Sequence, residues 1–209
     1  PYVGWGTGFV DFDNDTWLDL FVVNGHVYPQ MDEIVSGSKY RQGKLMHMNK
    51  GDGTFCDATK QAGEALSEPR VSRGAAFGDI DNDGNVDVVV EDLDSTPMIL
   101  RNEGIKGNRW IKFELSAAKG SPLAIGAKVK VTTGKVVQTE EVRSSTSYMS
   151  QNDLRLHFGL GNAAKVDKVE IFWPSGKVET LSDIKADKIY AVKEGKGVVP
   201  YRDISPSRN

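Results

Sequence analysis

Two short segments of the chain carry aspartate residues at the same spacing. In each segment, four aspartates occupy positions 1, 3, 5 and 9: Asp11, Asp13, Asp15 and Asp19, then Asp79, Asp81, Asp83 and Asp87. Two carboxylates about 4 Å apart repel each other by about 1 kcal/mol in water and by about 4 kcal/mol at an effective dielectric constant of about 20. Because a bound cation removes this repulsion, the spacing predicts that each segment binds a metal ion.

Calcium is the ion that this ligand set favours. Ca²⁺ accepts about six to eight oxygen ligands in a flexible geometry, and a loop that alternates ligands with other residues turns every second side chain inward. Position 7, which is Trp17 or Asn85, is expected to contribute its backbone carbonyl. The sequence therefore predicts two Ca²⁺ sites, in residues 11–19 (loop 1) and residues 79–87 (loop 2).

The two loops differ from an EF-hand and from each other. An EF-hand has a bidentate glutamate at position 12, where these loops have Val22 and Val90. At position 6 loop 2 has Gly84, which suits a sharp turn, whereas loop 1 has Thr16, which disfavours a positive φ. We therefore expect loop 2 to be the safer site and loop 1 to be weaker or differently shaped. The alternative is a pair of solvated turns without an ion.

Short apolar runs rich in β-branched residues must hold these loops in place. Residues 18–23 follow the first three aspartates of loop 1 and residues 86–90 those of loop 2, so each copy is expected to form a strand, a tight loop and a strand. Residues 45–49 and 98–102 predict one more strand in each copy. Residues 25–43 and 63–72 lack clean periodicity and are expected to form long loops.

The second half of the chain has a different pattern. From Arg109 onward, apolar and polar residues alternate in short runs separated by turn residues, and six or seven strands in about 85 residues are expected. This pattern predicts a compact antiparallel β-sandwich or small barrel. We place the domain boundary after Asn108, which gives a repeat domain (1–108), a sandwich domain (109–195) and a flexible tail (196–209).

Net charge also changes at this boundary. Residues 1–108 hold 18 acidic and 9 basic side chains, and residues 109–209 hold 11 and 17. An acidic first half argues against a nucleic-acid partner, because phosphate binding needs a basic surface. No stretch approaches the roughly 18 to 20 consecutive apolar residues that a membrane span needs.

Motifs in both halves resemble known families. Both loops, Phe-Xaa-Asp-Xaa-Asp-Asn-Asp followed by an apolar strand, resemble the FG-GAP (VCBS-type) repeat of integrin-like β-propellers. Four segments of the second half resemble the ASPIC/UnbV domain of cartilage-acidic-protein-like proteins: residues 126–129, 147–151, 157–161 and 173–176. The resemblance implies an all-β protein, with a partial β-propeller followed by a small antiparallel β-sandwich or barrel. It also implies a C-terminal fragment whose upstream blades are missing, because a closed propeller needs about four or more blades.

Three functional hypotheses follow. The first is a calcium-stabilised extracellular binding or adhesion module, secreted or at the cell surface with a periplasmic location as the alternative, whose ligand is a glycan or a protein. The second is a propeller-based enzyme whose catalytic residues lie in other blades, and the third is a passive spacer. The histidines show no metal-ligand spacing: His157 should face outward from its strand in a surface or hydrogen-bonding role, and His26 is the better candidate for a pocket.

Overall fold

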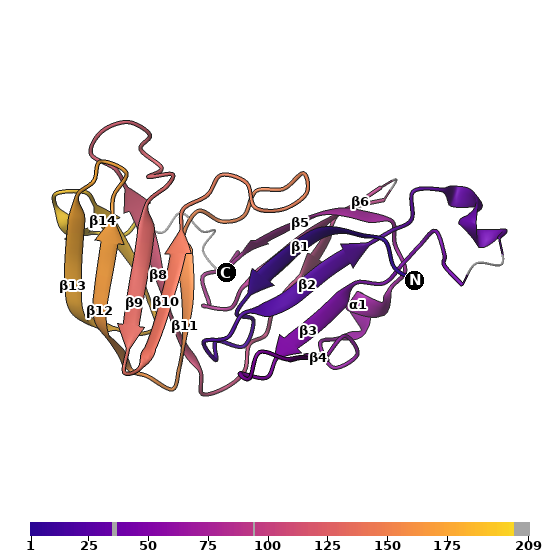
Figure 1. Cartoon of the computed structure of the whole chain (residues 1–209), viewed down its shortest axis with the longest axis horizontal. Coiled ribbons are helices and arrows are strands. Elements are labelled where there is room, and N and C mark those ends of the chain that lie inside the picture. The colour runs from indigo at the N-terminus through magenta and orange to yellow at the C-terminus, as the bar shows by residue number, and fades with distance from the viewer. Residues whose placement is uncertain (35–36, 94, 203–209) are drawn as a thin grey trace.

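The computed structural model describes residues 1–34, 37–93 and 95–202, and β-strands dominate them (Figure 1). The first half forms β1 (Gly4–Val10), β2 (Asp19–Asn24), β3 (Leu45–Asn49), β4 (Phe55–Asp57), β5 (Ser72–Gly78), β6 (Asp87–Asp92) and β7 (Met98–Leu100). The second half forms β8 (Arg109–Ser116), β9 (Lys128–Thr133), β10 (Val136–Glu141), β11 (Leu156–Gly161), β12 (Lys165–Phe172), β13 (Val178–Lys185), β14 (Lys188–Lys193) and β15 (Gly197–Val199). The expected all-β fold is confirmed.

The first half consists of two antiparallel sheets packed against each other. One sheet has the order β1-β2-β3-β4 and the other β5-β6-β7. The rings of Phe12, Phe21 and Phe77 meet between the sheets at centroid distances of 6.0 to 6.3 Å. Apolar residues at every second strand position face this shared core, which explains the alternating pattern of burial in β2 and β5.

Each aspartate loop connects the first two strands of its sheet. Val10 pairs with Asp19 at the end of the β1–β2 hairpin, and Gly78 pairs with Asp87 at the end of the β5–β6 hairpin. The predicted order of strand, loop and strand is therefore confirmed in both copies. β1 and β5 lie against each other, and a Cβ atom added to Gly6 would lie 2.6 Å from the backbone nitrogen of Ala75. This close contact brings the two loops to the same end of the unit.

The second half is a sandwich of two four-stranded sheets. Their orders are β10-β9-β12-β13 and β11-β8-β14-β15, and they enclose a core that includes Phe113, Phe158 and Ile171. The strand pairs are antiparallel except β8 and β14, which run parallel. The sheets do not close into a barrel, so of the two forms expected from the sequence the sandwich is the one observed.

Two details differ from the expectations. Residues 109–195 form seven strands, β8 to β14, in agreement with the six or seven expected there, whereas residues 197–199, expected within a flexible tail, form β15 against β14. The tail prediction missed this strand because its three residues are too few to show a pattern; residues 203–209 lie outside the described residues. The two segments expected to be long loops each carry one short helical turn: η1 (Pro29–Asp32) and α1 (Glu64–Ser67).

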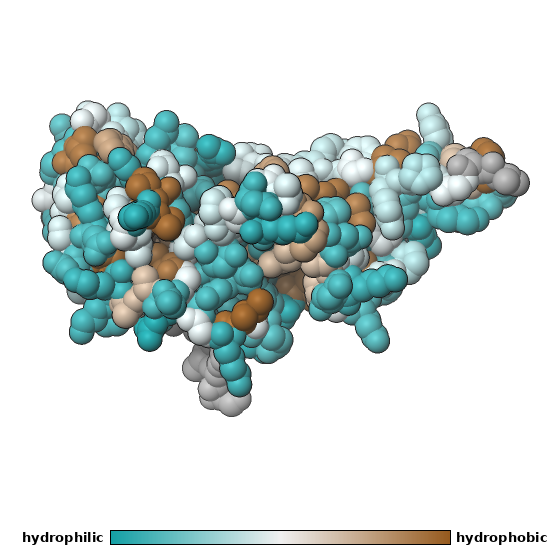
Figure 2. All heavy atoms as spheres, turned by 60° about the horizontal axis from the view of Figure 1, so that its bottom comes forward, coloured by the Kyte–Doolittle hydropathy of each residue, from teal (hydrophilic) through white to brown (hydrophobic). Residues whose placement is uncertain are grey.

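Most of the molecular face in Figure 2 is hydrophilic, and hydrophobic side chains form patches between polar ones. Among the described residues, no helix is both long enough and apolar enough to cross a membrane.

Candidate metal centres

Loop 1 folds around its first aspartate. Oδ1 of Asp11 accepts the backbone amide of Asp15 (3.0 Å), and Oδ2 accepts that of Thr16 (2.8 Å). Asp13 also accepts the amide of Asp15 (3.2 Å), and Asp15 accepts that of Trp17 (2.8 Å). One carboxylate oxygen from each of Asp11, Asp13 and Asp15 lies within 4.8 Å of the other two. Loop 1 thus gathers three of its predicted ligands.

Loop 2 repeats this backbone arrangement. Asp79 accepts the amides of Asp83 (3.1 Å) and Gly84 (2.8 Å), and Asp83 accepts the amide of Asn85 (2.9 Å). The close group of carboxylates here consists of Asp79, Asp81 and Asp87, again within 4.8 Å. Asp83 is outside this group in loop 2, as Asp19 is in loop 1. The two loops therefore share their hydrogen bonds but gather different sets of acids.

The aspartate at position 9 connects each loop to the next strand. Asp19 is buried and accepts the backbone amides of Phe12 (3.1 Å) and Asn49 (2.8 Å). Asp87 accepts those of Ile80 (3.0 Å) and Asn102 (2.8 Å) in the same way. Both carboxylates therefore join the start of the loop to the end of the third strand of the sheet.

The structure shows how position 6 accommodates a threonine. Thr16 has φ 87° and Gly84 has φ 93°, so both adopt the left-handed conformation. This conformation is strained for a β-branched residue. The corresponding amide bonds, Thr16 to Asp11 and Gly84 to Asp79, are both 2.8 Å long. The strain at Thr16 therefore does not change the hydrogen bonding of loop 1.

Burial makes the ionised form of several loop carboxylates unfavourable. Burial raises the pKa of Asp11 to about 8, and repulsion from Asp15 and Asp13 adds to the effect. Burial also raises the pKa of Asp19 to about 6 and shifts those of Asp13 and Asp87 in the same direction. A carboxyl group of this kind gains most from a nearby cation, which stabilises its charged form. Hard carboxylate oxygens, already close together, fit Ca²⁺.

Two basic side chains from outside the loops contact loop 2. The ammonium group of Lys112, on β8, forms a buried ion pair with Oδ2 of Asp79. Arg101 lies 3.0 Å from a carboxylate oxygen of Asp81 and 3.5 Å from one of Asp83. Neither residue was predicted to be part of the site. Arg101 directly follows the third strand of its sheet, and Lys112 comes from the sandwich, so their contacts with the loop depend on tertiary structure.

The sandwich packs directly on both loops through β8 and β11. Nε2 of His157 lies 2.7 Å from Oδ1 of Asn14, and the backbone amide of Gly161 donates to the carbonyl of Asn14 (2.8 Å). A Cβ atom on Gly159 would lie 2.0 Å from Asp11 Oδ2, and one on Gly84 would lie 1.8 Å from the indole of Trp110. The prediction that His157 points away from the sandwich core in a hydrogen-bonding role is thus confirmed.

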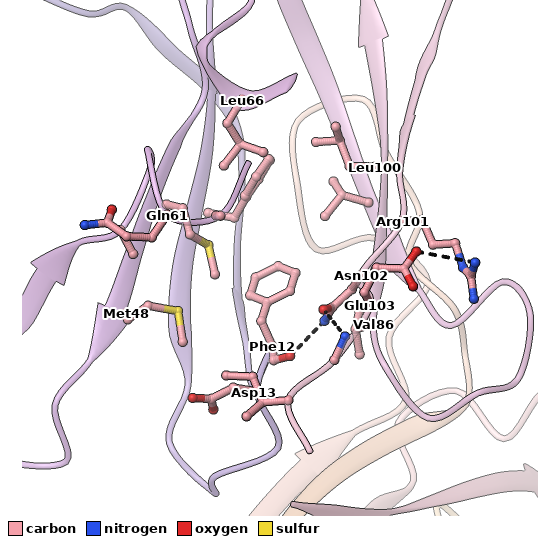
Figure 3. A pocket seen from close by; sticks show the side chains of 17 residues that line it. Phe12, Asp13, Met48, Gln61, Leu66, Val86, Leu100, Arg101, Asn102 and Glu103 are labelled. Atoms are coloured by element: carbon pink, nitrogen blue, oxygen red, sulfur yellow. Dashed lines mark hydrogen bonds and ion pairs between the residues drawn. The ribbon is translucent and has the colours of Figure 1, made fainter. Parts of the chain in front are cut away.

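Two cavities border the loops. The first, about 430 Å³, lies between the sheets of the first half and has a mostly apolar lining; Figure 3 shows Phe12, Met48, Leu66 and Leu100 around it. Its edge includes a hydrogen bond from Asn102 to the carbonyl of Phe12 (2.7 Å). The second, about 440 Å³, lies between the first half and the sandwich and is lined by more polar residues.

His26, proposed as a pocket residue, lines neither of these two cavities. Its Nδ1 accepts the backbone amide of Tyr28 (3.1 Å), and its ring lies 5.9 Å from that of Tyr28. These contacts of the His26 ring are with a residue two positions away, just after β2. His26 therefore provides no support for a catalytic site among the described residues.

Comparison with known proteins agrees with both halves of this architecture. A family model for FG-GAP-like repeats matches residues 30–90, and a model named ASPIC and UnbV matches residues 117–199. The chain is thus similar to an FG-GAP-like repeat followed by an ASPIC/UnbV domain. The FG-GAP match includes loop 2, while loop 1 lies upstream of it. The ASPIC/UnbV match begins after β8, so Lys112 precedes the matched residues.

Cartilage acidic protein 1 from three vertebrates is similar to most of this chain. The Mus musculus protein is 28% identical over 189 residues, which are 88% of this chain and 27% of that protein. The Xenopus tropicalis protein is 27% identical over 180 residues (82% and 26%), and the Homo sapiens protein is 28% identical over 173 residues (80% and 24%). The chain thus spans about a quarter of the length of these relatives.

Proposed function

We propose that this chain is a calcium-stabilised binding module of an extracellular protein. The observation that carries the proposal is the repeated loop: two hairpins fold identical hydrogen-bonding frames around aspartates, and each brings three carboxylates within 4.8 Å. Such groups repel one another unless a cation is bound. Calcium would supply this positive charge and hold the loops in a single conformation.

The proposed ligands are those indicated by the spacing. They are the carboxylates of Asp11, Asp13, Asp15 and Asp19 with the carbonyl of Trp17 in loop 1, and those of Asp79, Asp81, Asp83 and Asp87 with the carbonyl of Asn85 in loop 2. The close groups described above support six of the eight carboxylates. Asp19 and Asp83 would join them by small side-chain rotations, which a flexible Ca²⁺ geometry accommodates.

We further propose that the two sheets of the first half are adjoining blades of a β-propeller, with residues 1–108 and 109–195 as the two domains. The face-to-face packing of the sheets and the FG-GAP match support this arrangement. Other blades of the same protein would complete the propeller. The name of the matched relatives, cartilage acidic protein 1, supports a location outside the cell. The ligand would be a glycan or an extracellular protein.

Calcium titration tests the proposal. The chain, freed of divalent ions with a chelator, should bind Ca²⁺ in a calorimeter and melt at a higher temperature in its presence. At a hundredfold excess over the dissociation constant, one ion should raise the free energy of unfolding by about 2.7 kcal/mol. Magnesium at the same concentration serves as the control, because its smaller octahedral shell suits these loops less well. A chain without calcium-dependent heat or thermal shift would contradict the proposal.

The ligand class needs a separate measurement. A glycan array and a pull-down of extracellular matrix proteins, each with Ca²⁺ and with chelator, should give binding that depends on the ion. The enzyme hypothesis remains the alternative, with catalytic residues in other blades. A chain that binds nothing in either assay would favour the spacer hypothesis.

A further inference from the structure

The two loops have the same backbone but different electrostatic surroundings. Their hydrogen-bond frames match in partners and nearly in length, and each loop brings three carboxylates within 4.8 Å, so the frame gives no reason for unequal calcium affinity. The difference lies in the residues that other parts of the chain bring to each loop. This comparison rests on the proposed function, because it concerns the same two sites.

Loop 1 has no basic side chain paired with its carboxylates. Among residues 1–34, 37–93 and 95–202, no lysine, arginine or histidine nitrogen within 4.0 Å forms an ion pair with its four aspartates. Its neighbours from the sandwich are neutral: Gly159 packs on Asp11, and His157 contacts the Asn14 amide. Asn14 in turn donates to the carbonyl of Gly84 (3.2 Å), which fixes its Oδ1 as the acceptor toward His157.

Loop 2 contains two basic partners at the equivalent places. Lys112 pairs with Asp79 Oδ2, the oxygen equivalent to the one that Gly159 approaches in loop 1. Arg101 pairs with Asp81 and Asp83. Arg101 directly precedes Asn102, and the residue that precedes the equivalent Asn49 in the first copy is Met48. Three of the four loop 2 carboxylates therefore already contact a cation of the chain.

The two cations differ in how easily calcium could displace them. Arg101 is half exposed, at 50% of its side-chain surface, so its ion pairs are weak and its side chain can swing into solvent. Lys112 is 1% exposed and projects from a central strand of the sandwich, so its ammonium cannot leave without disturbing the packing between the two halves. Removing its partner would leave a buried charge without compensation.

We propose that the two loops bind calcium unequally: loop 1 is the tight site, whereas Lys112 and Arg101 weaken loop 2 by supplying part of its positive charge. A divalent ion entering loop 1 meets carboxylates that are not paired with a basic side chain among the described residues, whereas the same ion entering loop 2 meets two nearby like charges. This order is the reverse of the one expected from Gly84 and Thr16. Lys112 acts here as a residue that sets affinity and joins loop 2 to the sandwich.

Calorimetric titration of the whole chain with CaCl₂ after chelator treatment tests the order of the sites. The expected isotherm has two steps whose dissociation constants differ at least tenfold. Asp13→Asn should remove the tight step, and Asp81→Asn should remove the weak one. Circular dichroism of each variant checks that it remains folded. Two equal sites, or loss of the tight step in Asp81→Asn, would overturn the inference.

Arg101→Met tests the cause of the difference and places at this position the residue that the first copy carries. It should tighten the weak site at least threefold and leave the tight site unchanged. Arg143→Met is the matched control, because Arg143 is similarly exposed and pairs with Glu141 in the sandwich. An unchanged weak site in Arg101→Met would contradict the proposed mechanism. Absence of all calcium binding in the unaltered chain would instead contradict the proposed function.

Discussion

Gly84 is a residue on which two separate constraints act. Its φ of 93° lies in the left-handed region, and its Cα faces the indole of Trp110 so closely that a Cβ would lie 1.8 Å from Nε1. Thr16, in the same place in loop 1, has the same left-handed conformation, with φ 87°. Glycine is therefore required in loop 2 by the packing of the sandwich as well as by the turn.

We expect Gly84→Ala to destabilise the chain by about 3 kcal/mol or more, because the backbone strain and the overlap with Trp110 add to each other. Chemical denaturation followed by circular dichroism measures this. Gly53→Ala is the control: Gly53 also has a positive φ, 83°, but no atom lies within 4 Å of the added Cβ, so it should lose about 1 kcal/mol. If the two variants lost the same stability, the Trp110 side chain would be able to move away from the added methyl group at little cost.

His157 has one satisfied ring nitrogen and one that is not. Its Nε2 donates to Asn14, whereas the buried Nδ1 has no hydrogen-bond partner among the described residues. Burial lowers the pKa of His157 to about 3, and the charges of Lys112 and Arg155 act in the same direction. The folded chain therefore holds this ring neutral well below the ordinary pKa of about 6.5.

This pKa shift predicts that stability falls on acidification. Below about pH 6.5 His157 binds a proton in the unfolded chain but stays neutral in the folded chain. The free energy of unfolding that is present above that pH is therefore lost as the pH falls toward 3. The loss from His157 should be about 1 kcal/mol per pH unit. Urea denaturation at pH 7 and pH 5 measures it, with His157→Gln as the comparison, since glutamine keeps a donor but does not titrate. If the unaltered chain and His157→Gln lost the same stability between pH 7 and pH 5, His157 would not be the group responsible.

At the scale of elements, the position 9 aspartates connect hairpins to sheets. Asp19 holds the amides of Phe12 and Asn49, so one buried carboxylate fixes the start of loop 1 and the end of β3. Asn49 adds a bond from its side chain to the carbonyl of Leu18 (3.1 Å). Asp87 likewise accepts the amides of Ile80 and Asn102 in the second sheet, but the side chain of Asn102 donates to the carbonyl of Phe12 in loop 1.

Asp19→Ala should lower the stability of the metal-free chain by about 2 to 4 kcal/mol, because two backbone amides lose their acceptor in a buried position. Hydrogen exchange should show faster exchange at Phe12 and Asn49 in particular. Asp167→Ala is the control, since exposed Asp167 accepts the amide of Gly134 (2.8 Å) and no other hydrogen bond from the described residues, and it should cost less than about 1 kcal/mol. A loss below that limit in Asp19→Ala would show that water replaces the carboxylate.

At the scale of the whole molecule, the sandwich uses β8 and β11 to contact both loops. Arg155 donates to the carbonyl of Asp79 (2.8 Å) and pairs with Asp153 (2.6 Å), while Asn108, just before β8, donates to the carbonyl of Asp13 (2.7 Å). The amide of Phe77 donates to Asn152 (3.1 Å). Ordering of the loops and docking of the sandwich are therefore expected to stabilise each other.

Gly159→Ala should weaken this docking, because the added methyl group would overlap Asp11 Oδ2. Small-angle X-ray scattering should report a larger radius of gyration, and the segment 103–108 should become more sensitive to proteases. Gly134→Ala is the control, at a hairpin turn with no atom within 4 Å of the added Cβ. A Gly159→Ala chain with unchanged scattering would show that the interface adjusts without opening.

The sequence by itself determined those features that depend on neighbouring residues. Alternating apolar residues specified the strands, and the repeated aspartates located both loops, because hairpin geometry and carboxylate spacing are local properties. The three-residue strand β15 was missed because so short a segment carries no periodic signal. The parallel pairing of β8 with β14 also could not be predicted from local sequence patterns, because it joins strands far apart in the chain.

Only the tertiary structure decided what surrounds each loop. Lys112 is 33 residues from Asp79 and His157 is 143 residues from Asn14, and on their strands both read as ordinary outward-facing polar residues. Their contacts exist because the sandwich packs on the hairpins, which no spacing in the sequence encodes. Since charges act through space rather than along the chain, the sequence could predict two similar loops, but only the fold could make their electrostatic surroundings different.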